Sequence, residues 1–283
     1  MTRKTHNIKI NEKIIIGNDL PFTLIAGPCQ MESRDHTFSM IKSLSEITNE
    51  LNIPFIFKTS FDKANRSSGN SERGIGLEKA LDIFREIKAT FDCPILTDVH
   101  SETQCELVAS VVDILQIPAF LCRQTDLVKA VASTGKIVNV KKGQFLSPWD
   151  VKNIIEKIES TGNHKILLTE RGVSFGYNTL IVDPRSIPIM AKTGYPTVID
   201  ATHAIQQPGG LGNATGGDRE MAPIIARSAI ANGVAAVFIE THDNPDNAPS
   251  DGPNMIALDQ MHGLLKVLQQ LDRIAKEYPV ILS

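Results

Sequence analysis

The sequence predicts an α/β protein with one domain over residues 1–283, a closed (β/α)8 TIM barrel preceded by a short N-terminal β-hairpin segment at 1–20. Eight short apolar runs recur along the chain, and helical patterns separate most of them. Apolar runs without alternation are typical of parallel strands that are covered on both faces. The 283 residues also suit one such barrel, which typically takes about 250.

The predicted barrel strands are eight segments of similar length. In order they are 21–29, 54–60, 94–100, 113–119, 137–143, 165–172, 197–203 and 236–242. The segment 8–17, "IKINEKIIIG", precedes them and predicts the hairpin. A doubly wound open sheet is the rival architecture, but the count of eight favours closure and no glycine-rich nucleotide motif follows the first strand.

Helices are predicted from apolar residues at helical spacing. Such residues recur over 38–51, 77–87, 151–158 and 258–271. Ser147 followed by Pro148 reads as an N-cap with proline in the first turn, so the third of these helices is expected to begin there.

Composition excludes several classes of function. The net charge of -3 argues against a nucleic-acid binder, and no apolar run approaches the length of a membrane span. The basic N-terminus is not followed by an apolar signal core. Four cysteines in so long a chain do not form a disulfide framework, so a reduced, cytoplasmic protein is expected.

Polar residues stand at the carboxyl end of every predicted strand. They are Cys29, Lys58, Asp98, His100, Gln116, Lys141, Arg171, Asp200, His203, Glu240 and His242. In a closed barrel these ends meet at one mouth, where the active sites of such enzymes lie. The set therefore predicts an active site there.

One group at this mouth suits a divalent metal ion. Closure would make the strands that carry Cys29, His203 and Glu240 neighbours. A thiolate, an imidazole and a carboxylate together can bind a divalent ion, and Asp251 is a candidate fourth ligand. Spacing alone leaves His203 and His242 open as the histidine ligand.

A second group at the mouth is cationic. It consists of Lys58, Lys63, Arg66, Arg123, Lys141 and Arg171. Arginine with its planar fork suits phosphate and carboxylate, and there are more cations here than one phosphate needs. Two anionic substrates are therefore expected, or one substrate with anionic groups at both ends.

A series of motifs carries a family resemblance. In order they are "AGPC" (26–29), "FKTSFDKANRSS" (57–68), "TDVH" (97–100), "QIPAFLCRQTDL" (116–127), "NVKKGQF" (139–145), "ERGVSFGYN" (170–178), "DATH" (200–203) and "ETH" (240–242). From about residue 22 to the last helix the chain resembles the 3-deoxy-D-manno-octulosonate 8-phosphate synthases, also called 2-dehydro-3-deoxyphosphooctonate aldolases. The resemblance implies condensation of phosphoenolpyruvate with D-arabinose 5-phosphate and water, with release of phosphate, on the route to the lipopolysaccharide sugar.

The resemblance also implies roles for matched residues. The phosphoenolpyruvate carboxylate would be held by Lys58, Ser60, Lys63 and Gln116, and its phosphate by Arg123, Lys141 and Arg171. The arabinose phosphate would contact Asn65, Arg66, Ser67 and Asp98, with Arg66 and Ser67 acting in a neighbouring subunit of a homo-oligomer, expected to be a tetramer. Lys63, Asp98 and His203 are the expected catalytic residues.

Cys29 places the chain in the metal-dependent branch that the resemblance implies, because the metal-independent branch has asparagine there. His203, Glu240 and Asp251 match the other ligands. This ligand set leaves zinc, iron(II), manganese and cobalt open. Gly69 and Asn70 stand where the family often has isoleucine and histidine, a departure that bears on the loop.

Three other functions are alternatives to this predicted one. The related 3-deoxy-D-arabino-heptulosonate 7-phosphate synthases use erythrose 4-phosphate but have a proline-arginine-threonine pattern in place of "DKANRSS". A Schiff-base aldolase would use Lys141 as its nucleophile. A non-catalytic phosphosugar-binding barrel would need no metal ligands.

Overall fold

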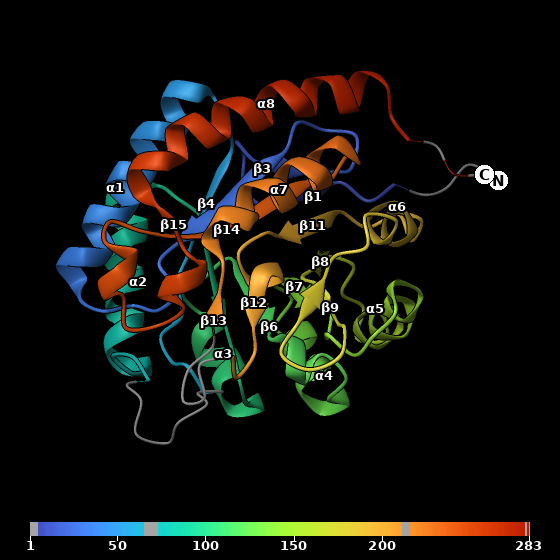
Figure 1. The fold of residues 1–283 in the computed structure, drawn as a ribbon. Coiled ribbons are helices and arrows are strands. Elements are labelled where there is room, and N and C mark those ends of the chain that lie inside the picture. The colour runs from blue at the N-terminus through green and yellow to red at the C-terminus, as the bar shows by residue number, and fades with distance from the viewer. Residues whose placement is uncertain (1–4, 65–72, 211–215, 281, 283) are drawn as a thin grey trace.

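The closed barrel is confirmed. The structure, a computed structural model, describes residues 5–64, 73–210, 216–280 and 282. The parallel barrel strands are β3 (Thr23–Gly27), β4 (Phe55–Lys58), β5 (Ile95–Asp98), β6 (Ile114–Ile117), β7 (Ile137–Lys141), β8 (Ile166–Glu170), β11 (Thr197–Asp200) and β14 (Ala236–His242). Each pairs with the next along the chain, and β14 pairs in parallel with both β11 and β3, which closes the sheet (Figure 1).

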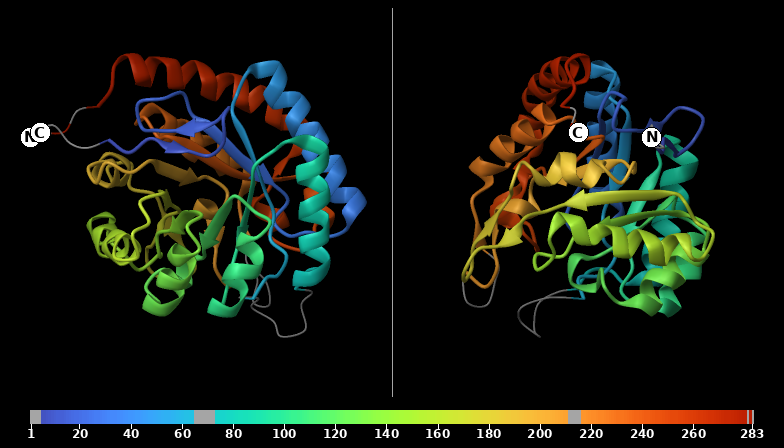
Figure 2. Two further views of the ribbon diagram at one scale, coloured as in Figure 1. Left: turned by 180° about the vertical axis from the view of Figure 1, so that it is seen from behind. Right: turned by 90° about the vertical axis from the view of Figure 1, so that its right-hand side faces the viewer.

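Helices surround the barrel, as the views in Figure 2 show from two further sides. They are α1 (Arg34–Leu51), α2 (Leu77–Phe91), α3 (Glu102–Ala109), α4 (Thr125–Ser133), α5 (Val151–Glu159), α6 (Ser186–Ala191), α7 (Ala222–Ala231) and α8 (Met261–Glu277). Each buries an apolar stripe against the outer face of the strands, and these contacts form the larger core. None of the helices in the described ranges is long and apolar enough to cross a membrane.

The helix expected from Ser147 begins slightly differently. Residues Pro148–Asp150 form a 3-10 turn, and α5 follows directly from Val151. The Ser147 hydroxyl donates to the Asp150 carboxylate at 2.7 Å, and both bonds of a capping box are present. The predicted cap is confirmed, with the proline in a tighter first turn.

The N-terminal hairpin is also confirmed, and it closes the bottom of the barrel. Strands β1 (Ile8–Lys9) and β2 (Ile15–Ile16) pair antiparallel. Their buried residues Ile8 and Ile16 join one apolar cluster with inward-facing residues of the barrel strands. Those strand residues are Ile25, Ile56, Leu96, Ile114, Ile137, Leu167, Val198 and Phe238.

Shorter strands and 3-10 helices lie at the end of the barrel opposite the hairpin. They are the strands β9 (Val173–Ser174), β10 (Leu180–Ile181), β12 (Gln206–Gln207), β13 (Gly216–Gly217) and β15 (Ile256–Ala257), and the 3-10 helices η1 (Ala119–Leu121), η2 (Pro148–Asp150), η3 (His203–Ile205), η4 (Arg219–Met221), η5 (Pro245–Asn247), η6 (Gly252–Asn254) and η7 (Leu258–Gln260). β9 pairs with β10, β12 with β13, and β15 extends alongside the end of β14. Apart from η2 and η7, which lie within predicted helices, these elements are not among those predicted from the sequence.

Strand periodicity positions the functional side chains. Successive side chains of a strand point to opposite faces, so residues two and four positions beyond the inward apolar layer also point inward. Such residues include Lys58, Asp98, Gln116, Lys141, Asp200 and Glu240, all buried. The barrel interior is therefore apolar at the hairpin end and ionisable at the carboxyl end of the strands.

Candidate active site

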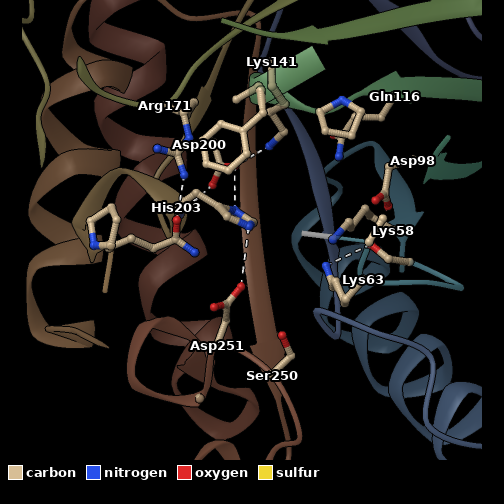
Figure 3. A pocket seen from close by; sticks show the side chains of 18 of the residues that line it. Lys58, Lys63, Asp98, Gln116, Lys141, Arg171, Asp200, His203, Ser250 and Asp251 are labelled. Carbon is tan, nitrogen blue, oxygen red and sulfur yellow. Dashed lines mark hydrogen bonds and ion pairs between the residues drawn. The ribbon is translucent and has the colours of Figure 1, made fainter. Parts of the chain in front are cut away.

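A cavity of about 680 Å³ opens at the carboxyl ends of the strands. Its lining includes Lys58, Ser60, Lys63, Asp98, Gln116, Lys141, Arg171, Asp200, His203 and Asp251. In Figure 3, Lys58, Lys63, Asp98 and Gln116 lie on one side of the mouth, and Arg171, Asp200, His203 and Asp251 lie on the other. The volume falls within the range of about 300–1,000 Å³ that is usual for small-molecule sites.

Lys58 is buried at the base of this cavity. Its ammonium donates to Glu240 Oε1 at 2.5 Å and to the Cys29 carbonyl at 3.3 Å. Gly27 allows this approach of β3 to β4, because a Cβ there would lie 2.0 Å from the Lys58 carbonyl oxygen. Since Glu240 also faces the candidate metal ligands, Lys58 connects the metal side of the site to the cationic side.

Lys63 and Asp98 lie on the same side of the cavity and share Ser60. The Lys63 ammonium donates to Ser60 Oγ at 3.0 Å, and the Ser60 hydroxyl donates to Asp98. Burial alone would lower the pKa of Lys63, but Cys29 and Glu240, when ionised, outweigh burial and raise it. Lys63 is thus held as a cation that faces the cavity.

Asp98 is held as a carboxylate by His100. His100 Nε2 lies 2.9 Å from Asp98 Oδ2. Burial would raise the pKa of Asp98, but the hydrogen bond and charge of His100 outweigh burial and lower the pKa. The carboxylate is therefore a hydrogen-bond acceptor, which suits contacts to hydroxyl groups of a substrate.

Lys141 lies across the cavity between Asp200 and an aromatic ring. Its ammonium donates to the Asp200 carboxylate and lies 3.2 Å from the centre of the Phe238 ring. Burial lowers the pKa of Lys141 to about 8, against the opposing effect of Asp200. Asp200 also lies 2.8 Å from His203 Nδ1, so one carboxylate orients both a lysine and a histidine.

Arg171 is a cation with spare hydrogen-bonding capacity. Its Nη2 donates to Gln206 Oε1 at 2.7 Å, whereas the buried Nη1 has no hydrogen-bond partner. Burial lowers the pKa of Arg171, with the charge of Asp200 acting against this. A buried guanidinium with an unpartnered nitrogen beside Lys141 suits a bound phosphate, whose oxygens accept such donors.

The predicted metal ligands converge next to this cluster. Ligand atoms of Cys29, Glu240 and Asp251 all lie within 4.8 Å of one another. His203 Nε2 lies 3.7 Å from Glu240 Oε2 and 3.9 Å from Asp251 Oδ2. The Cys29 thiol is 3.3 Å from Asp251 Oδ2.

The chemistry of this donor set fits a divalent transition ion. Burial, with Glu240 adding to it, raises the pKa of the Cys29 thiol well above its usual value. Burial would raise the pKa of Glu240 too, but His203 and Lys58 outweigh burial and lower it to about 2. An ion at this point would favour the thiolate and join it to the carboxylates and the imidazole. Asp251 has a left-handed backbone with φ of 54°, a conformation that aspartate adopts more readily than most residues other than glycine.

The two candidate histidines lie in different places. His203 faces Glu240 and Asp251, whereas His242 Nε2 lies 2.7 Å from Glu32 Oε1, in a separate cluster. His203 is therefore the histidine that lies with the other candidate ligands.

One predicted residue lies outside the cavity, and three others cannot be compared with it. Arg123 is exposed and is not part of the cavity lining. Asn65, Arg66 and Ser67 lie outside the described residues, as do Gly69 and Asn70. The roles predicted for these residues stay predictions.

Two site residues were not assigned a role from the sequence. Asp200 lies two positions after the inward-facing Val198, and His100 lies four after the inward-facing Leu96. Both belong to the predicted set of polar strand-end residues, and strand periodicity carried forward from the apolar layer would have shown that both point inward.

Fold and site together define a barrel with a mouth for anionic substrates and a candidate metal centre. Sequence comparison identifies the family. The sequence profile of the DAHP synthetase I family matches residues 5–277, and the chain belongs to this family.

Relatives within the family are close in sequence. The chain is 59% identical to the 2-dehydro-3-deoxyphosphooctonate aldolase of Brucella anthropi over 276 residues, which cover 98% of this chain and 99% of that protein. Proteins of the same name in Brucella ovis and Brucella abortus are each 58% identical over the same shares. The resemblance inferred from the motifs is confirmed.

Proposed function

We propose that the chain condenses phosphoenolpyruvate with D-arabinose 5-phosphate and water to give 3-deoxy-D-manno-octulosonate 8-phosphate and phosphate. The observation that carries this proposal is the row of buried cations, Lys58, Lys63, Lys141 and Arg171, in one cavity. The names of the Brucella relatives support the same reaction. The product is a precursor of the lipopolysaccharide sugar, and the protein acts in the cytoplasm.

The phosphate of phosphoenolpyruvate binds Lys141 and Arg171. The unpartnered Arg171 Nη1 supplies one donor, and the Lys141 ammonium supplies another beside it. The carboxylate binds on the opposite side, at Lys58, Ser60, Lys63 and Gln116. The side-chain oxygen of Gln116, Oε1, already accepts a hydrogen bond from Asn139 at 2.9 Å. The side-chain nitrogen of Gln116 is therefore left to donate to the substrate.

The sugar phosphate occupies the outer part of the mouth. The Asp98 carboxylate accepts hydrogen bonds from sugar hydroxyls, and Asn65 adds another contact. Arg66 and Ser67 bind the phosphate at the far end of the sugar. Lys63 lies between the two substrates and holds the reacting carbons close together, which is an orientation effect.

Carbon–carbon bond formation joins C3 of phosphoenolpyruvate to the aldehyde carbon of the open-chain sugar. Water adds at C2, and the resulting hemiketal phosphate loses inorganic phosphate. The cations of the cavity stabilise the negative charge on the substrates throughout. The ammonium of Lys63 donates to the developing alkoxide, while Asp98 and His203 hold the hydroxyl groups and the attacking water in position.

A divalent metal ion is the proposed cofactor, held by Cys29, His203, Glu240 and Asp251. Zinc, iron(II), manganese and cobalt all suit this donor set. When bound, the ion supplies Lewis acidity for the water or the aldehyde. Asp200 Oδ2 lies 2.8 Å from His203 Nδ1, the ring nitrogen that faces away from the candidate ligands, and a carboxylate in this position is usual behind metal-bound histidines.

The protein is proposed to be a homo-oligomer, a tetramer, with shared active sites. Large aromatic side chains are exposed after β6, β7 and β8, namely Phe120, Phe145, Trp149, Phe175 and Tyr177. Exposed apolar residues in such number are typical of protein interfaces. Arg123, predicted to hold the phosphoenolpyruvate phosphate, is exposed and does not line its own cavity, so we propose that it contacts that phosphate in a neighbouring subunit.

The test is release of inorganic phosphate from phosphoenolpyruvate in the presence of each sugar. Arabinose 5-phosphate is expected to support turnover, and erythrose 4-phosphate to be a poor substrate. Faster turnover with the four-carbon sugar would replace this assignment with the heptulosonate reaction. No phosphate release with either sugar would leave a binding protein.

Lys141 allows a direct test of the Schiff-base alternative. With a pKa of about 8 the amine is partly neutral near neutral pH, as a nucleophile requires. However, Lys141 donates to Asp200, and the expected role is phosphate binding. Borohydride added during turnover is expected to trap no adduct on the protein, while a Schiff-base aldolase treated in parallel is trapped and inactivated. A substrate-dependent adduct on Lys141 would establish the aldolase chemistry instead.

A further inference from the structure

A second histidine–carboxylate cluster lies outside the cavity, between the start of α1 and the end of β14. Ligand atoms of Glu32, His36 and His242 all lie within 4.8 Å of one another. Glu32 and His36 come from the segment that opens α1, and His242 is the last residue of β14. None of the three lines the cavity or takes part in the proposed reaction.

The distances in this cluster fit a metal ion. His242 Nε2 lies 2.7 Å from Glu32 Oε1, and His36 Nδ1 lies 3.9 Å from the same oxygen. In a tetrahedral zinc site, bonds of about 2.1 Å place neighbouring ligand atoms about 3.4 Å apart. The two measured distances lie on either side of this value, so small side-chain shifts would complete the geometry.

Asp243 provides the outer partner that metal-bound histidines need. Its Oδ1 lies 3.1 Å from His36 Nε2 and 3.0 Å from His242 Nδ1. One carboxylate therefore faces the outer nitrogen of both rings, and the inner nitrogens are left facing Glu32. A metal-bound histidine usually donates a hydrogen bond from its second ring nitrogen to such a carboxylate.

The inner nitrogen of His36 is itself unusual. His36 Nδ1 is buried and has no hydrogen-bond partner. A buried polar atom without a hydrogen bond is costly, and an unfilled ion site is one explanation for it. The two rings lie 4.6 Å apart between centroids, close enough to share one ion.

The ring of His242 is oriented for this role by the backbone. The backbone N–H of Asn244 donates to His242 Nδ1 at 2.9 Å, and His242 Nε2 lies 2.7 Å from Glu32 Oε1. The nitrogen that would bind the ion is therefore the one that faces Glu32.

We propose that Glu32, His36 and His242, with Asp243 behind both rings, form a second divalent-metal site of the zinc type, distinct from the centre at Cys29. Three protein ligands leave a fourth position for water. The site is reachable from solvent, because the Glu32 side chain is 28% exposed. An ion here would fasten α1 to the end of β14, from which the loop carrying Asp251 begins.

Zinc content tests the proposal. Untagged protein is loaded with zinc, dialysed against metal-free buffer, and measured by elemental analysis. Two ions per chain are expected for the parent protein, one for His36→Gln, one for Cys29→Ala, and none for the double variant. His262→Gln is the matched control, because His262 also meets a glutamate, Glu50 at 3.0 Å, but belongs to none of the metal-ligand groups. This control should keep two ions.

Thermal unfolding supplies a second readout. Ions that bind only the folded chain raise its unfolding temperature. Zinc should therefore stabilise Cys29→Ala, in which only the second site remains, and should no longer do so once His36→Gln or Glu32→Gln is added. A His36→Gln variant that keeps as many ions as the parent protein, or zinc that fails to stabilise Cys29→Ala, would overturn the proposal. Neither result bears on the condensation reaction, which is assayed separately.

Discussion

Lys58 and Glu240 form an ion pair inside the barrel, with 2.5 Å between the ammonium nitrogen and Oε1 and only 1% of each side chain exposed. The two residues come from β4 and β14, which lie on either side of β3. Removal of both charges from water is costly, and their mutual attraction offsets this only while both are present. The rest of the site, rather than the attraction between these two charges alone, therefore keeps the pair in place.

Loss of one partner should destabilise the protein strongly. Lys58→Met is expected to lower the free energy of unfolding by about 3–5 kcal/mol, because Glu240 is left buried without its partner. The double variant Lys58→Met/Glu240→Gln should lose less than the sum of the two single variants. Urea unfolding measures each value.

An exposed lysine–glutamate pair supplies the control. Lys9 and Glu12 lie 2.6 Å apart, with 56% and 89% of their side chains exposed. Lys9→Met should cost less than about 1 kcal/mol, as is usual for surface pairs. Equal effects of Lys58→Met and Lys9→Met would show that burial of the first pair has no energetic consequence.

Metal removal should abolish activity. Chelation is expected to stop phosphate release and added divalent ion to restore it, because the ligand atoms of Cys29, Glu240 and Asp251 lie together and His203 is next to two of them. Cys29→Ala should lose activity and also the thiolate–cobalt absorption of the cobalt-loaded protein. Cys105→Ala, which removes another buried thiol far along the chain in α3, should keep both. Full activity in protein shown by elemental analysis to be free of metal would disprove the requirement.

Arg171 should set the affinity for phosphoenolpyruvate. Arg171→Lys removes the fork that offers Nη1 to the phosphate, so KM for phosphoenolpyruvate should rise about tenfold to a hundredfold, as expected for a lost charged hydrogen bond of about 1.5–3 kcal/mol. KM for the sugar phosphate should change little. Arg185→Lys, on an exposed arginine that pairs with Asp183, is the control and should leave both constants unchanged. A larger change in the sugar constant would place Arg171 at the other phosphate.

Much of the fold and site was predictable because it depends on strand periodicity. Apolar runs marked the strands, and the first polar residue after each run marked the mouth, as Lys58 and Glu240 illustrate. Both effects are local in sequence, since alternation along a strand fixes which side chains point inward.

The remaining features depend on three-dimensional contacts, which strand periodicity does not predict. His242 was left open as a ligand, but β14 continues through it and pairs with β15, His242 opposite Ala257, and its ring meets Glu32. Arg123 lies two residues beyond the 3-10 helix η1, where no alternation rule predicts the direction of a side chain. Its outward position became visible only in three dimensions.

The last prediction concerns active sites that are shared between subunits. The resemblance implies that Arg66 acts in a neighbour's site, and the same role is proposed for Arg123, which is exposed on its own barrel. Lys141, by contrast, is buried in its own barrel. Arg66→Ala and Arg123→Ala should each be nearly inactive, and so should Lys141→Ala.

Mixed oligomers distinguish the two arrangements. When either arginine variant is reassembled with Lys141→Ala, some sites combine an intact Lys141 with an intact arginine from the neighbour. Activity should then reappear well above that of either parent, provided that tagging of one variant and isolation of mixed oligomers shows that subunits exchange. An arginine that serves its own subunit gives no such gain, because each chain then carries one defect in its own site. Mixed oligomers no more active than their parents would therefore assign that arginine to its own barrel.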